Sequence, residues 1–160
     1  MYSDDELADM YRDIGRANAC GADGMVIGVL DRHHRIDLGR TRELVSAAAG
    51  APVTFHRAFD LVPEKLDALD ALAAAGVKRV LTSGGPATAD EGASTLAQLV
   101  DYAGDRIVVL AGGNVRAHNV RDLVQRTGVR EVHARCELDP ARIAGIRQAL
   151  GEARRGPLSS

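Results

Sequence analysis

The chain has 160 residues, a formal net charge of −2, and only 3% aromatic residues within a 46% hydrophobic composition. This length accommodates one domain with a core of Ala, Val, Leu and Ile, and the nearly balanced charge disfavours nucleic acid as a partner. The longest apolar stretch, residues 25–30, is too short to cross a bilayer, and the acidic start does not resemble an export signal. Cys20 and Cys136 are too few for a disulfide scaffold. We therefore expect a cytoplasmic protein that engages neither nucleic acid nor membrane.

One pattern recurs along the chain: a helical run rich in Ala and Leu, then a glycine, then a short burst rich in Val and Ile. The repeat glycines are Gly21, Gly50, Gly76, Gly104 and Gly128. Glycine is typical of a helix C-terminus because it adopts the left-handed conformation without a Cβ penalty. Successive glycines lie 24 to 29 residues apart, which is close to the length of one βα unit.

The expected helices also carry start signals. Ser3 and Glu6 have the spacing of a capping box, and Asp139 followed by Pro140 places a capping residue before proline at the first helical position. Alternating helices and short apolar strands predict an α/β fold with a parallel sheet, either doubly wound or closed into a barrel. The βα units are of similar length and lack the G-x-G-x-x-G fingerprint, which favours the barrel over the doubly wound sheet. We expect a single domain over residues 1–150 and a disordered tail over residues 151–160.

The motifs at the expected strand ends resemble those of one known family. These motifs are VTFHRAFD (residues 53–60), RVLTSGG (79–85), LAGGNVRAHNV (110–120) and EVH (131–133), together with residues 21–40. They resemble the CutC copper-homeostasis family over about residues 2–150. The resemblance implies a partial (β/α)8 TIM barrel that runs from the family's helix 3 through strand 8 and helix 8. A misplaced start codon and a truncated gene are both consistent with the absence of the earlier units.

The segment VTFHRAFD supplies the first candidate site residues. Alternation along the strand points Thr54 and His56 into the barrel, at the end where (β/α)8 proteins carry their functional groups. One interpretation makes His56 a general acid, base or ligand, with Arg57 binding an anion and Asp60 orienting either side chain. The other makes Arg57 and Asp60 an ion pair that closes the loop, with His56 filling the interior.

Glycine-rich turns follow the next two strands. Thr82, Ser83 and Gly84 follow the first of them, and Gly112 with Gly113 follows the second. Exposed backbone N–H groups in such turns can bind a phosphate or another anion. Equally, these are tight turns that need glycine for conformation alone.

The last strand places Glu131 and His133 on the interior side by the same alternation, and His133 is the remaining candidate catalytic residue. His133 and Cys136, three residues apart, are a candidate pair of metal ligands, because copper(I) prefers sulfur and accepts imidazole. Arg135 between them either binds an anion or is solvated.

The resemblance implies a cytoplasmic CutC-like protein of copper homeostasis, with copper(I) as the implied metal and direct copper binding as an open question. One alternative is a TIM-barrel enzyme acting on a small phosphorylated or carboxylated ligand at the C-terminal ends of the strands. Another is an inactive fragment. Five strands of an eight-stranded barrel would leave two open edges, so we also expect homo-oligomers or aggregation.

Overall fold

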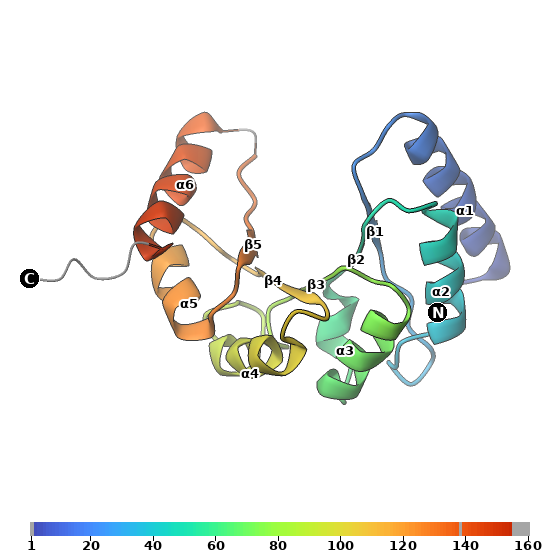
Figure 1. Cartoon of the computed structure of the whole chain (residues 1–160), viewed down its shortest axis with the longest axis horizontal. Coiled ribbons are helices and arrows are strands. Elements are labelled where there is room, and N and C mark those ends of the chain that lie inside the picture. Colours follow the sequence, from blue (N-terminus) through green and yellow to red (C-terminus); the bar gives the residue numbers. More distant parts are fainter. Residues whose placement is uncertain (1, 138, 155–160) are drawn as a thin grey trace, which may run out of the picture. The chain divides into compact units, whose positions relative to one another are not determined.

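The computed structural model describes residues 2–137 and 139–154. Helices and strands alternate along the described chain, as Figure 1 shows. In order, the elements are α1 (Asp4–Ala19), β1 (Met25–Ile27), α2 (Leu38–Ala47), β2 (Val53–Phe55), the 3-10 helix η1 (Arg57–Leu61), α3 (Lys65–Ala74), β3 (Arg79–Thr82), α4 (Ala93–Ala103), β4 (Val108–Gly112), α5 (Val120–Thr127), β5 (Glu131–His133) and α6 (Pro140–Arg154).

The described strands form one five-stranded sheet in the order β1-β2-β3-β4-β5. The pairs β1–β2, β2–β3 and β4–β5 are parallel, with Met25 opposite Val53 and Leu110 opposite Glu131. Parallel strands in chain order, each connected to the next through a helix, are the arrangement of consecutive βα units. The predicted α/β fold with a parallel sheet is therefore confirmed.

The chain divides into two compact units. The first contains the residues up to Leu81 together with Ala103–Val108, and the second contains Thr82–Tyr102 and the residues from Val109 onward. The predicted boundary at residue 150 needs a correction, because α6 continues to Arg154. Ala153 and Arg154 have high helix propensity, so the last helix extends into the segment expected to be disordered. The rest of the expected tail, residues 155–160, lies outside the described residues.

The core of the first unit follows the alternation predicted for its strands. Val53 and Phe55 are at most 1% exposed, whereas Thr54 between them is partly exposed. In β1 the same pattern gives a buried Met25 and a Val26 that is 65% exposed. The helices contribute further buried side chains to this core, among them Ile14, Leu44, Leu69 and Leu72. Burying each of these large side chains contributes about 1.5–3 kcal/mol relative to exposure.

The second unit repeats this arrangement. Val109 and Ala111 of β4 are buried, while Leu110 between them is partly exposed. Leu96 and Leu99 of α4, and Val120 and Leu123 of α5, complete the core. β4 therefore also has one buried face, whereas β5 has two partly buried residues and an exposed His133.

The predicted helix-terminating glycines and the two predicted N-terminal caps are confirmed. All of the repeat glycines have a positive φ, between 55° and 93°. The Ser3 side chain accepts a hydrogen bond from the Glu6 backbone, and Glu6 accepts one from the Ser3 backbone at 2.7 Å, which completes the capping box. Asp139 accepts a hydrogen bond from the Ala141 backbone N–H at 2.9 Å and so caps α6.

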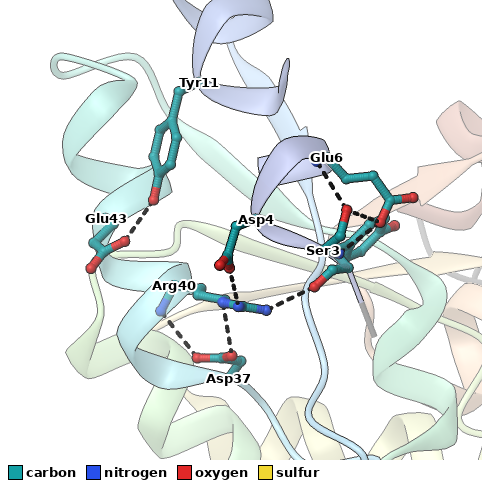
Figure 2. Close-up of polar contacts among 8 residues, drawn as sticks. Ser3, Asp4, Glu6, Tyr11, Asp37, Arg40 and Glu43 are labelled. Carbon is teal, nitrogen blue, oxygen red and sulfur yellow. Dashed lines mark hydrogen bonds and ion pairs between the residues drawn. The ribbon is translucent and has the colours of Figure 1, made fainter. Parts of the chain in front are cut away.

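Polar contacts hold α1 against α2 (Figure 2). The Arg40 guanidinium donates to the Tyr2 carbonyl and to Asp4 Oδ1, each at 3.1 Å, and its Nε lies 3.6 Å from Asp37 Oδ2. The Tyr11 hydroxyl donates to Glu43 Oε2 at 2.6 Å. This hydrogen bond raises the pKa of Tyr11 to about 12, because deprotonation would place two negative charges together. In the described part of the chain, no helix is both long enough and apolar enough to cross a membrane.

Candidate functional site

Arg57 and Asp60 form an ion pair directly after β2. Arg57 Nε lies 2.7 Å from Asp60 Oδ2, and the Asp60 side chain is only 7% exposed. Lys65 Nζ donates to the carbonyls of Asp60 and Val62 at 3.2 and 2.8 Å. These contacts hold the η1 turn together. They match the ion-pair interpretation of the sequence, and the Arg57 side chain, 40% exposed, still reaches solvent beside His56.

His56 lies at the end of β2, where its backbone N–H donates to the Ile27 carbonyl at 2.8 Å. Its Nδ1 accepts a hydrogen bond from the Ala58 backbone N–H at 3.1 Å. Because Nδ1 is an acceptor, the neutral ring carries its hydrogen on Nε2. Partial burial lowers the pKa of His56, so the ring is neutral at pH 7.

This hydrogen bonding limits what His56 can do chemically. A neutral histidine that binds a metal through Nε2 must carry its hydrogen on Nδ1, which usually donates to an oxygen. That arrangement would break the bond from the Ala58 backbone N–H. His56 is therefore arranged as a hydrogen-bond donor through Nε2–H, and not as a metal ligand through that atom.

Gly28 is a site residue that the sequence analysis missed. A Cβ placed on Gly28 would overlap the His56 imidazole, with even Nε2 only 2.7 Å away. The absence of a side chain at Gly28 thus makes room for the ring. A glycine inside an apolar strand often marks a close approach, and this signal was present in GMVIGVL. The sequence did not show which side chain approaches.

A cavity of about 310 Å³ lies beside His56 in the first unit. Met10 and Ile14 of α1, Val26 of β1, Gly28 and His56 are among its lining residues. Its lining is mostly apolar and its volume is within the range of small-ligand pockets. Asp13 and His56 are the titratable residues of its lining.

The turn after β3 is built by its own side chains. Thr82 and Ser83 are fully buried. Thr82 Oγ1 accepts from the Gly84 backbone N–H at 2.9 Å, and the Ser83 hydroxyl donates to the Pro86 carbonyl. These hydroxyls thus fix the shape of the turn. A role for Thr82, Ser83 and Gly84 in anion binding stays a prediction.

Glycine after β4 permits close packing of two loops. A Cβ on Gly113, whose φ is +120°, would lie 3.1 Å from the Ser83 Cβ and 3.2 Å from the Ala87 carbonyl oxygen. The Gly113 carbonyl in turn accepts from the Ala89 backbone N–H at 2.9 Å. This contact supports the conformational interpretation of the glycine-rich turn. The anion cradle at Gly112 and Gly113 also stays a prediction.

The end of β5 carries the remaining candidates. Leu110 pairs with Glu131 and Gly112 with His133. Glu131 and Val132 are both partly buried and His133 is exposed, so the placement of Glu131 and His133 on the interior face stays a prediction. His133 is exposed, and Cys136 is a partly buried free cysteine. In the part of the chain that the structure describes, no three or more His, Cys, Asp or Glu side chains are grouped to hold a metal ion. His133 and Cys136 would thus supply at most two protein ligands to a metal ion.

Parallel strands in chain order with outer helices, and polar side chains after the strand ends, define a partial (β/α)8 barrel. A CutC crystal structure from Streptococcus agalactiae matches it with a TM-score of 0.80 and 36% identity, covering 83% of this chain and 65% of that chain. A muconate lactonizing enzyme from Klebsiella pneumoniae shares only the fold, at 19% identity and a TM-score of 0.67.

Sequence comparison identifies the family. The CutC family model matches residues 1–137. CutC family proteins from Glaesserella parasuis serovar 5 and Caulobacter vibrioides are each 44% identical to this chain, over 133 and 132 residues. The chain belongs to the CutC family, and the predicted resemblance is confirmed. These alignments cover 83% and 82% of this chain but 55% and 54% of the relatives, so the chain spans about half of their length.

Proposed function

We propose that this chain takes part in copper homeostasis in the cytoplasm. The observation that carries the proposal is its membership of the CutC family, with 44% identity to curated relatives. The matching Streptococcus agalactiae structure is of a protein named for copper homeostasis. The proposal extends that role to the part of the family fold that this chain contains.

Within this role, His133 and Cys136 are the proposed copper(I) ligands. A thiolate and an imidazole are suitable donors for this soft ion, and Cys136 lies three residues after His133, the last residue of β5. His56 is left out of the ligand set, because its Nδ1 accepts from the Ala58 backbone. Cys20, an exposed cysteine at the end of α1, precedes β1 and is also left out.

Titration with copper(I) under anaerobic, reducing conditions, in competition with a chromogenic chelator, tests this ligand set. We expect Cys136→Ser and His133→Ala to weaken copper(I) binding by roughly tenfold or more, since each removes a proposed ligand. Cys20→Ser is the matched control, because it removes an exposed thiol outside the set. Equal affinities for Cys136→Ser and the unchanged protein would rule out the proposed ligands.

A second candidate function has its own support in the first unit. We propose that His56 donates a hydrogen bond from Nε2 to an oxygen of a small phosphorylated or carboxylated ligand. Its neutral ring, oriented by the Ala58 backbone N–H, fits a hydrogen-bond donor. The adjacent cavity is large enough for a small molecule.

Nuclear magnetic resonance of the protein labelled with ¹⁵N-histidine tests the His56 proposal. Addition of acetate or phosphate should shift the His56 Nε2 resonance, which His56→Asn identifies by removing it. The resonances of His33 and His34, exposed in the loop after β1, serve as internal controls. A His56 resonance that neither anion moves would contradict the proposal.

A further inference from the structure

The second unit contains a cavity of about 540 Å³ with a basic lining. Arg116 and His118 reach it from the loop after β4, Arg135 from the loop after β5, and Arg142 from the first turns of α6. Buried Ile146 of α6 contributes an apolar side chain. His118 lies just before α5, is exposed, and lines this cavity.

Arg116 is the most informative of these side chains. It is partly buried, its Nη1 donates to the Val115 carbonyl at 2.8 Å, and its backbone N–H donates to Asn119 Oδ1 at 2.7 Å. Among the residues that the structure describes, no carboxylate pairs with its guanidinium. Partial burial of a cation without a counter-charge is unfavourable, so an anion in the cavity would stabilise it.

The other two arginines share their acidic partners. Arg135 Nε lies 3.5 Å from Glu137 Oε1, and Arg142 contacts Glu137 at 3.0 Å and Asp139 at 3.3 Å. These side chains are 44–79% exposed, so the pairs are weak and solvent-screened. Three guanidinium groups therefore face two carboxylates, and the cavity keeps a net positive charge.

Local backbone features shape the cavity. Asn114, which also lines it, has a φ of +56°, a left-handed conformation that asparagine tolerates better than most residues. A Cβ on Gly145 of α6 would lie 3.3 Å from the Ala117 Cβ, so glycine there lets α6 pack closely on the loop after β4. The arginines of α6 and of that loop are thereby brought to one cavity.

We propose that this cavity binds the phosphate group of a small phosphorylated molecule, with Arg116 as its main anchor. The planar guanidinium group matches phosphate oxygens with two parallel hydrogen bonds, and the dianion balances the excess positive charge. The volume exceeds what phosphate alone needs, which leaves space for the organic part of a ligand. The proposal does not depend on copper binding or on the His56 site.

Isothermal titration calorimetry of inorganic phosphate into the full chain tests the proposal. We expect binding at millimolar phosphate, weakened by about tenfold or more in Arg116→Gln, which removes a charge-assisted pair. Arg147→Gln is the matched control, since Arg147 is an exposed arginine of α6 outside the cavity lining. Its phosphate affinity should equal that of the unchanged protein.

Circular dichroism and thermal melting establish that Arg116→Gln is folded, and Arg135→Gln provides a second position for the same test at a side chain that is 79% exposed. Unchanged phosphate affinity in both variants would overturn the site, and so would acetate binding as tightly as phosphate. Copper(I) affinity should be the same in Arg116→Gln as in the unchanged protein. The two proposals therefore fail or succeed separately.

Discussion

At the scale of single residues, Gly28 and His56 form a matched pair. The imidazole occupies the space that a Cβ on Gly28 would need, and the Ala58 backbone N–H fixes which ring nitrogen carries the hydrogen. The ring is thus oriented by two contacts, one steric and one polar. A side chain held in this way is preorganised to donate to a ligand.

Substitution Gly28→Ala should displace the His56 ring and destabilise the protein by about 1–3 kcal/mol, the usual cost of overpacking. Urea unfolding measures the loss. Gly15→Ala is the control, because no atom lies within 4 Å of a Cβ placed there. Alanine at this interior position of α1 should stabilise the protein by about 0.5–1 kcal/mol. Equal stability of Gly28→Ala and the unchanged protein would show that the ring is not held there.

The lowered pKa of His56 makes a prediction about pH. Its usual value is 6.5, and burial depresses the value in the folded state, so the unfolded chain binds the proton more readily. The His56 contribution to stability is therefore present above pH 6.5 and is lost as the pH falls through 6.5 toward the folded-state value. The free energy of unfolding, followed by urea titration between pH 5 and 8, should fall less steeply with acid in His56→Asn. Identical slopes would contradict this assignment.

At the scale of elements, the position of α1 depends on α2. Arg40 connects α2 with the Tyr2 carbonyl and Asp4 at the start of α1, and its side chain is only 26% exposed. Tyr11 and Glu43 add a contact further along both helices. Because α1 also lines the cavity beside His56, these contacts help to define that cavity.

Removal of the Arg40 guanidinium should loosen the start of α1. We expect Arg40→Met to lower stability by about 1 kcal/mol, since its ion pairs are partly solvent-screened, and to speed amide hydrogen exchange in the first turns of α1. Arg42→Met, an exposed arginine of the same helix, is the control. Unchanged exchange in α1 would mean that apolar packing alone holds the helix.

At the scale of the whole molecule, β1 is an end strand of the sheet. On the side facing β2, the Met25 N–H donates to the Pro52 carbonyl and the Ile27 carbonyl accepts from the His56 N–H. Because backbone groups alternate in direction along a strand, the N–H and carbonyl of Val26 point away from β2, toward the edge of the sheet. The Val26 side chain is 65% exposed and lines the cavity beside α1. An end strand with an exposed apolar side chain favours pairing with another chain.

We therefore predict concentration-dependent self-association of this chain, which analytical ultracentrifugation measures. Val26→Asp should shift the equilibrium toward the monomer, because a buried carboxylate disfavours strand pairing. Leu61→Asp is a matched control, since Leu61 is 61% exposed but lies in η1. A monomer at all concentrations would refute the prediction.

Much of the fold could be predicted because its signals are local. A glycine after each of α1 to α5 indicates a left-handed backbone conformation, and alternation in Val53–Phe55 indicates one buried face. The expected start of a disordered tail at residue 151 was wrong, because helix-forming residues continue α6 to Arg154. Element ends depend on small differences in propensity, which makes them harder to place than the elements themselves.

The α/β class, the parallel βα units, the CutC family and the candidate residues at the strand ends all follow from local sequence patterns. Which residues meet depends on how the elements pack. Gly28 makes room for His56, Ser83 and Gly113 approach across two loops, and Arg116 shares a basic cavity with Arg135. The physical reason is that such contacts join residues far apart in the chain. Their distances follow from the packing of whole elements, which no local pattern encodes.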